Sequence, residues 1–342
     1  MLILARESRG HTQSELAEIA GVPQSRISKL EDGLIPAPPE DIMAKIAVSL
    51  NRPMHFFYQR GGRAACASFY RKKSSLPKRV LNTIDARMNI QRLHIEKLVK
   101  AVEFENKQIP HLDPDEIEGG PSQIAKQVRS FWGLPRGPVK DVIKIVEDLG
   151  CIVVFFNFET RKIDGLSVFT NDGTPVIFVN RDIPMDRMRF TIMHEVGHII
   201  MHRVPTPNME PEAHEFAAEF LMPASDITST LYPLNIAQLA RLKLYWKVAM
   251  AALLKRAETL GAISERYSRF LWMQMGKYGY RSMEPHGENL PKEQPSLLKE
   301  IIQTHLTDLE YSVGDLAFSL ALNEEEFQQI YLPPSSKIQL MA

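Results

Sequence analysis

The sequence predicts an α+β protein that is mostly helical, and three observations support this fold class. Residues 1–58 show the spacing of short helices, a short run of strands follows between residues 151 and 180, and helical spacing returns beyond Leu234. Apolar residues make up 44% and charged residues 24% of the 342 positions, which is an ordinary globular balance. This composition excludes a wholly disordered chain, a collagen-like repeat and a small disulfide scaffold.

Changes in composition divide the chain into four expected segments. They are a helical domain at 1–60, a basic and partly helical connector at 61–118, a mixed domain at 119–232 and a helical region at 233–342. The boundary before residue 119 lies in a stretch rich in Pro, Asp and Gly, which favours turns and loops. No internal repeat of roughly 20 to 50 residues stands out.

The N-terminal segment carries the marks of two short helices joined by a tight turn. Thr12-Gln13-Ser14-Glu15 is a capping box, in which the Thr12 hydroxyl accepts from the Glu15 backbone and the Glu15 carboxylate reaches back. Gly21 suits the stop of the first helix, and Pro23 suits the start of the second. The apolar residues that we expect to face inward are Leu16, Ala17, Ala20, Ile27 and Leu30. This plan is typical of a helix-turn-helix motif, although any small helical bundle shows the same spacing.

The stretch ARESRGHTQSELAEIAGVPQSRISKLEDGL closely resembles the phage-repressor-like (XRE-type) helix-turn-helix family. That family places a Gln at the start of each helix of the motif, and these positions match Gln13 and Gln24. The resemblance implies double-stranded DNA as a partner, and a dimer is compatible with it. The residues that it implies in base and phosphate contacts are Gln13, Gln24, Ser25, Ser28 and Lys29. Pro23 departs from the family, which often has Ser there.

Charge is unevenly distributed along a chain whose 41 basic and 41 acidic residues cancel. Residues 1–60 are neutral overall, which is weak for phosphate binding, whereas residues 60–100 carry a net charge of +9. This basic stretch either supplies the missing positive field or is simply a solvated helix face. Cys66 and Cys151 form no C-x-x-C pair, no leader-like segment begins the chain, and no apolar run of about 18 residues occurs. We therefore expect a cytoplasmic protein without a membrane partner.

The mixed domain is expected to alternate helices with a small sheet. Residues 139–149 form an amphipathic helix ending at Gly150, and residues 151–156 read as a buried strand. Residues 166–170 and 176–180 read as two more strands joined by the turn signal Asn171-Asp172-Gly173. Helical spacing then returns from residue 185 to 200 and from residue 212 to 221. A core-facing helix is expected over residues 239–260, where Trp246 and Met250 are interpreted as packing residues.

The strongest chemical pattern in the sequence is His194-Glu195-Val196-Gly197-His198. On a helix the two His side chains lie on one face, so both imidazoles can bind one ion, and Glu195 can accept a proton from a water on that ion. Zinc lowers the pKa of such a water towards 7, which makes hydroxide available at neutral pH. The plainer alternative is a helix surface that carries two unrelated His residues.

A third zinc ligand is needed, and the residues alone leave it open. His202 lies about 12 Å along the helix axis from His194, which is too far for the two to share an ion. In the next helix Glu212 and Glu219 both flank the apolar face, about 10 Å apart, so only one can reach the metal. Each of them could equally be a solvated surface acid.

The sequences PVIFVNRDIPMDRMRFTIMHEVGHIIMHR and EPEAHEFAAEFLMP look like the ImmA/IrrE family of zinc metallopeptidases. The resemblance implies a zincin-like peptidase domain and zinc held by His194, His198 and Glu212, with Glu195 as the catalytic residue. Glu212 matches the family's third ligand because it precedes Ala213 and falls four positions before Phe216. His214 departs from the family, which usually has Asn or Asp there. Tyr232 and His202 are the two candidates for stabilising the oxyanion.

Together these features predict a DNA-binding transcriptional regulator with zinc-dependent endopeptidase activity. The resemblance implies a protein substrate of the repressor type, cleaved in a stress or phage-related response. Two alternatives remain open at this point. One is a transcription factor whose zinc site is structural or sensory, and the other is an antitoxin-like module that binds DNA and protein.

Overall fold

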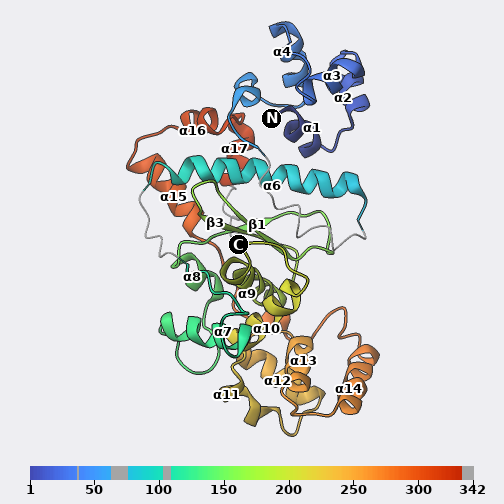
Figure 1. The fold of residues 1–342 in the computed structure, drawn as a ribbon, viewed down its shortest axis with the longest axis vertical. Coiled ribbons are helices and arrows are strands. Elements are labelled where there is room, and N and C mark those ends of the chain that lie inside the picture. Colours follow the sequence, from blue (N-terminus) through green and yellow to red (C-terminus); the bar gives the residue numbers. More distant parts are fainter. Residues whose placement is uncertain (37, 63–75, 103–108, 333–342) are drawn as a thin grey trace, which may run out of the picture. The chain divides into compact units, whose positions relative to one another are not determined.

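The computed structural model describes residues 1–36, 38–62, 76–102 and 109–332, which fold into two compact units (Figure 1). Unit 1 consists of Met1–Phe104, Val168–Thr174 and Leu297–Ala342, and unit 2 consists of Glu105–Ser167 and Pro175–Ser296. The basic residues Arg63, Arg71, Lys72 and Lys73, together with Cys66, lie outside the described residues.

The N-terminal part of unit 1 contains the short helices that the spacing predicts. They are α1 (Leu2–Ser8), α2 (Gln13–Ala20), α3 (Gln24–Glu31), α4 (Glu40–Ser49) and the 3-10 helix η1 (Met54–Tyr58). The predicted capping box at Thr12 and Glu15 is present, and Gly21 ends α2 in the left-handed conformation with φ of 62°. The inward-facing residues Leu16, Ile27 and Ile46 are fully buried, so the three helices α2, α3 and α4 share one core.

Unit 1 also contains a long helix and the C-terminal helices. They are α6 (Lys78–Val99), α15 (Leu297–Thr307), α16 (Val313–Leu320) and α17 (Glu324–Tyr331). α6 packs against α1: Ala86 and Ile90 belong to the same core as α2 to α4, and Arg87 donates to the Ser8 carbonyl over 2.9 Å. The basic segment from residue 78 onward is thus a packed helix of the N-terminal unit.

Unit 2 is built on a three-stranded sheet with the order β1-β3-β2, formed by β1 (Ile152–Phe156), β2 (Gly165–Phe169) and β3 (Pro175–Asn180). β1 pairs in parallel with β3, and Ile152 lies opposite Val176. β2 and β3 form the predicted hairpin, with the turn at Asn171–Gly173 closed by a bond from Thr170 N–H to Thr174 O. All residues of β3 are buried because it is the central strand.

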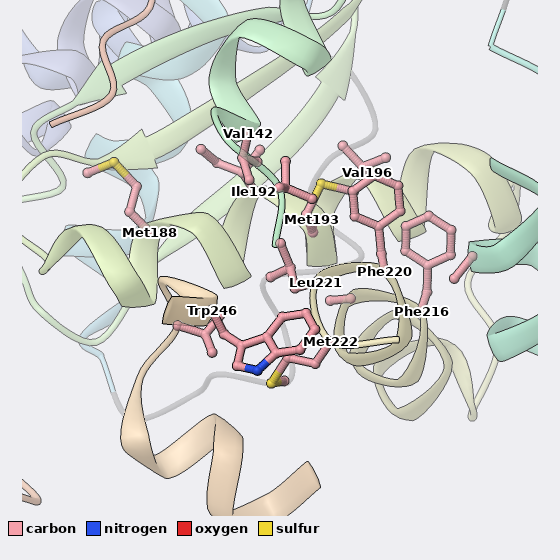
Figure 2. Close-up of a cluster of buried hydrophobic side chains, with 14 of the residues drawn as sticks. Val142, Met188, Ile192, Met193, Val196, Phe216, Phe220, Leu221, Met222 and Trp246 are labelled. Atoms are coloured by element: carbon pink, nitrogen blue, oxygen red, sulfur yellow. The ribbon is translucent and has the colours of Figure 1, made fainter. Parts of the chain in front are cut away.

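Helices supply most of the remaining core of unit 2. They are α7 (Gly120–Phe131), α8 (Val142–Glu147), α9 (Met185–Met201), α10 (Met209–Leu221), α11 (Ala224–Ile227), η2 (Thr228–Leu231), α12 (Ile236–Trp246), α13 (Met250–Thr259), α14 (Glu265–Lys277) and η3 (Gly287–Asn289). Figure 2 shows side chains of α9, α10 and α12 meeting in this core, with Phe216 and Phe220 beside Val196. The core fixes α9 against α10, which matters for the site described below.

Two expectations differ from the observed elements. The helix expected over residues 239–260 is broken, because Lys247 adopts φ of 55° and Glu284 accepts the free backbone N–H groups of Met250 and Ala251 at the start of α13. The helix expected over residues 139–149 is shorter, since α8 spans only Val142–Glu147.

None of the described helices has the length and the apolar composition that crossing a bilayer requires. Burial raises the pKa of the Cys151 thiol well above its ordinary value, so this residue is a packing group in unit 2.

Candidate metal centre and DNA-reading face

The candidate metal centre lies where α9 and α10 approach each other closely. Gly197 makes this approach possible: a Cβ atom there would lie 3.2 Å from the Ala213 Cα and 3.2 Å from the Phe216 ring. Because His194 and His198 are one helical turn apart on α9, both rings face α10. Glu195 is buried on the same helix.

Three side chains from the two helices converge. The Nε2 atoms of His194 and His198 are 3.1 Å apart, and the Glu210 oxygens lie 3.4 Å and 3.7 Å from them. Two ligand atoms bound to one tetrahedral zinc at about 2.0–2.1 Å lie roughly 3.3 Å apart, so the three donors already have the spacing of a zinc site. The His194 Nδ1 atom is buried without a hydrogen-bond partner among the described residues, so the contacts of this ring's nitrogens with the site are made through Nε2. Two imidazole nitrogens and one carboxylate oxygen are a donor set that suits zinc.

Glu212, which the family resemblance implies as the third ligand, does not join this cluster. Its Oε2 atom lies 2.9 Å from His202 Nε2, and His202 Nδ1 lies 3.0 Å from His198 Nδ1. Glu212, His202 and His198 are therefore linked by consecutive hydrogen bonds. These bonds fix the His198 ring and direct its Nε2 atom towards Glu210. Glu219 is also away from the cluster, because it is buried in an ion pair with Arg256.

Glu195 is positioned by the edge strand of the sheet. The Ser167 hydroxyl on β2 donates to Glu195 Oε2 over 2.7 Å. β2 runs close to α9, since a Cβ atom on Gly165 would lie 2.6 Å from Thr191 Cγ2 and 3.8 Å from Glu195 Cγ. Sequence reasoning missed both Ser167 and Glu210. Its one clue to Ser167 was a polar residue between buried Leu166 and Val168 on the strand before the metal motif.

The remaining polar residues near the centre have distinct surroundings. The His214 ring lies 4.7 Å from the Phe190 ring and 5.9 Å from the His194 ring, and partial desolvation by these neighbours, helped by the charge of His194, lowers the pKa of His214. Tyr232 is 80% exposed. His202 is buried in its bonds to His198 and Glu212, which leaves neither oxyanion candidate placed among the converging donors.

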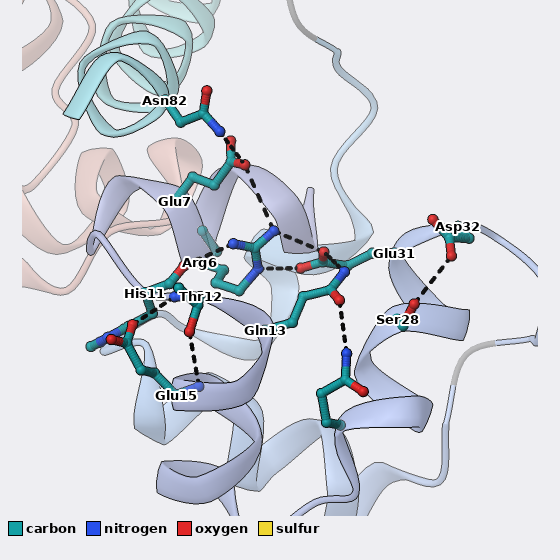
Figure 3. Close-up of polar contacts among 12 residues, drawn as sticks. Arg6, Glu7, His11, Thr12, Gln13, Glu15, Ser28, Glu31, Asp32 and Asn82 are labelled. Atoms are coloured by element: carbon teal, nitrogen blue, oxygen red, sulfur yellow. Dashed lines mark hydrogen bonds and ion pairs between the residues drawn. The ribbon is translucent and has the colours of Figure 1, made fainter. Parts of the chain in front are cut away.

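In unit 1 the two Gln residues of the helix-turn-helix motif are brought together. Gln24 Nε2 donates to Gln13 Oε1 over 3.0 Å, and Gln13 Nε2 donates to Glu31 over 2.8 Å. Glu31 is held in turn by a two-point bond from Arg6, with distances of 2.6 Å and 2.8 Å (Figure 3). Both Gln side chains are therefore pre-positioned by a buried ion pair, which lowers the entropy cost of an ordered contact.

The other residues predicted to contact DNA lie on the outer side of α3. Ser25 and Lys29 are exposed, and the Ser28 hydroxyl bonds to Asp32 over 3.3 Å. Arg26 adds a second positive charge to this helix. The first turn of α3 thus presents amide and hydroxyl groups, with Lys29 one turn further on, which is the arrangement that a helix in the major groove uses.

Comparison with protein-family models gives two matches. Residues 2–57 match the family model described as helix-turn-helix, and residues 146–258 match the model described as the IrrE N-terminal-like domain of the M78 peptidases. The comparison with curated proteins gives no match. The two matched segments agree with the predicted fusion of an XRE-type motif and an ImmA/IrrE-type domain.

Proposed function

Because the chain combines a helix-turn-helix domain with an IrrE N-terminal-like peptidase domain, we propose that it is a DNA-binding regulator whose second domain is a zinc-dependent endopeptidase. The observation that carries the enzymatic part is the convergence of His194, His198 and Glu210 next to the buried Glu195. A site that served only structure would have no need of a general base beside its ligands.

Each residue of the candidate centre has a separate role in the proposed peptide hydrolysis. A zinc ion bound here would act as a Lewis acid that polarises the scissile carbonyl and lowers the pKa of a nearby water. His194 and His198 would hold this ion through their Nε2 atoms. Glu195 takes the proton of the attacking water on its carboxylate and returns it to the leaving amine. Ser167 keeps that carboxylate oriented through its bond to Oε2.

The geometry and the family resemblance favour different residues as the third zinc ligand. The geometry favours Glu210, whose oxygens face both imidazoles, and the resemblance favours Glu212. We expect Glu210→Ala to lower the zinc content of the purified chain far more than Glu212→Ala. Glu215→Ala is the matched control, because Glu215 lies on the same helix, is exposed and accepts a hydrogen bond from Ser122. The reverse order of the first two variants would assign the ligand to Glu212.

The peptidase activity is tested by Glu195→Gln in the full chain. This variant should keep about one zinc per chain and lose cleavage, since the amide cannot take up the proton. Glu265→Gln, an exposed position on α14, should cleave like the unmodified chain. The ImmA/IrrE resemblance supports a repressor-type protein as substrate in a stress or phage-related response, so repressors encoded beside this chain are the substrates to co-express. Unchanged cleavage by Glu195→Gln would refute the role of Glu195 as the general base, and no cleavage by the zinc-loaded unmodified chain would refute the enzymatic proposal.

The DNA-binding part is tested through two residues with different expected roles. Lys29→Ala should weaken binding to all sequences and reduce the slope of affinity against salt by about 1, as expected for one phosphate contact. Gln24→Ala should relax sequence preference at one position and cost about 1–3 kcal/mol on the preferred site. Equal effects of both variants on all DNA sequences would contradict a reading role for Gln24.

A further inference from the structure

The C-terminal helix pair α16–α17 has the same plan as the pair α2–α3. Each of its helices is eight residues long and begins and ends 300 positions after its counterpart: α16 (Val313–Leu320) matches α2 (Gln13–Ala20), and α17 (Glu324–Tyr331) matches α3 (Gln24–Glu31). The sequences share little beyond Leu-Ala at 16–17 and at 316–317. This is why no repeat stands out in the sequence.

The local geometry of the two pairs agrees in detail. Both first helices begin with a full capping box, Thr12 with Glu15 and Ser312 with Asp315. Both end on a left-handed residue with φ of 62° at Gly21 and 54° at Ala321. The buried residues of the first helices also correspond: Leu16, Ala17 and Ala20 match Leu316, Ala317 and Leu320. Residues 312–331 therefore form a second motif of the helix-turn-helix type.

The charge of the second motif excludes the role of the first. α3 begins with Gln24 and Ser25 and carries Arg26 and Lys29, whereas α17 begins with three Glu residues and carries no basic residue. A helix with this charge is repelled by the phosphates that line the major groove. The second motif thus keeps the framework of a DNA reader without the charges that DNA requires.

One of these acids is bonded to the N-terminal domain. Glu326 lies 3.2 Å from Arg9, at the end of α1, and 3.1 Å from Arg52, which follows α4. The Arg52 side chain is only 5% exposed, and burial lowers its pKa to about 10 while Glu326 opposes that shift. Removing Glu326 would leave a buried guanidinium without its acidic partner.

The first helix and the turn of the second motif also contact the N-terminal part of unit 1 and α6. His55 bonds to the Phe318 carbonyl over 2.8 Å, and Lys97 donates to the Ser319 carbonyl over 2.7 Å. Ala321 is fully buried and belongs to the core formed by α1 to α4, although its left-handed backbone would favour Gly. At the corresponding Gly21, a Cβ atom would have no neighbour within 4 Å. The Ala321 methyl group, in contrast, is packed in the core.

We infer that residues 312–331 are a second helix-turn-helix motif that binds protein in place of DNA, with the chain's own DNA-reading domain as its partner. It holds that domain through Arg9, Arg52 and His55. The residues proposed to read DNA lie on α2 and on the outer side of α3, so the same domain can be held by the second motif and read DNA at once. The second motif stabilises the reader and adds no second reading helix.

The experiment compares Glu326→Gln with Glu325→Gln in the full chain. Both variants remove one negative charge from α17, but Glu325 is exposed. By hydrogen exchange, Glu326→Gln should speed amide exchange in α1 and α4 about tenfold or more, and Glu325→Gln should leave it unchanged. Equal exchange in the two variants would overturn the docking role of Glu326.

A measurement on the unmodified chain covers the case in which Glu326→Gln fails to fold. The slowest amides of α16 and α17 should exchange with the same protection as those of α1 and α4, because they open as one unit. Free exchange of α16 and α17 beside a protected α4 would refute the inference.

A second part of the experiment adds DNA and rests on the proposed function. Its duplex is selected from a random pool by binding to the unmodified chain. DNA should add protection in α2 and α3 and none in α17. Protection of α17 by DNA would overturn the inference, whereas failure to enrich any duplex would refute only the proposed DNA binding.

Discussion

Replacing Gly197 by Ala tests whether the close packing of α9 on α10 builds the metal centre. A Cβ atom at this position would lie 3.2 Å from the Ala213 Cα, 3.2 Å from Phe216 Cδ1 and 3.4 Å from the Ala213 carbonyl oxygen. Two of these atoms belong to the backbone of α10, so they cannot swing aside as a flexible side chain could. The two helices must separate by a few tenths of an ångström, which moves Glu210 away from His194 and His198.

The size of the effect follows from two opposing contributions. Overpacking a well-filled core costs about 1–3 kcal/mol. Replacing Gly by Ala inside a helix gains about 1 kcal/mol in helix propensity. The zinc-free chain with Gly197→Ala should therefore be less stable by about 0–2 kcal/mol. Zinc binding should weaken about tenfold, as when the supports of a metal ligand are disturbed.

Gly276→Ala provides the matched control for this prediction. Gly276 lies in α14 of the same unit, and the three atoms nearest to a Cβ atom there belong to the flexible Arg281 side chain, the closest at 3.5 Å. This variant should keep its zinc affinity and gain up to about 1 kcal/mol. Denaturant unfolding of the zinc-free chains and zinc titration against a competing chelator measure both quantities. If Gly197→Ala matched Gly276→Ala in both assays, the packing argument would be refuted.

Three further predictions follow from individual contacts. Ser167→Ala removes the bond to Glu195 Oε2, so kcat/KM should fall about tenfold with zinc content unchanged; loss of zinc would contradict this. Glu31→Ala removes the two-point partner of Arg6, whose side chain is 10% exposed and keeps a longer contact of 3.7 Å to Glu7, so unit 1 should lose up to about 3–5 kcal/mol in denaturant unfolding; a change near zero would refute a stabilising buried ion pair. Burial lowers the pKa of His94 to about 3, so the unfolded state takes up this proton first, and unit 1 should lose stability as pH falls from about 6.5 towards 3. His94→Gln should flatten this pH dependence, and an unchanged slope would exclude His94 as its source.

Local patterns in the sequence predicted the parts of the fold that depend on neighbouring residues. The capping box at Thr12, the hairpin turn at Asn171–Gly173 and the helix through His194 and His198 are confirmed, because each is specified within a few positions of the chain. The break in the helix expected over residues 239–260 was not predictable in this way. The carboxylate of Glu284, some 34 positions from Met250, accepts the backbone N–H groups at the break.

The candidate metal centre was also only partly predictable from local sequence patterns. Glu210 and Glu212 both lie in the first turn of α10, two positions apart, so the apolar stripe of that helix cannot decide which one faces α9. The choice depends on where His202 lies, since its ring bonds to Glu212. The second helix-turn-helix motif was hidden for a different reason: its framework is defined by caps, a left-handed turn residue and burial, which many sequences satisfy.

The most direct test of the account is the position of zinc in crystals of the full chain, located by anomalous diffraction at the zinc edge. We expect one strong peak per chain, within about 2.0–2.2 Å of the Nε2 atoms of His194 and His198 and of a Glu210 oxygen. Absence of a peak between the two imidazoles after zinc is supplied, or a peak whose remaining position is closed by another protein group, would contradict a hydrolytic centre.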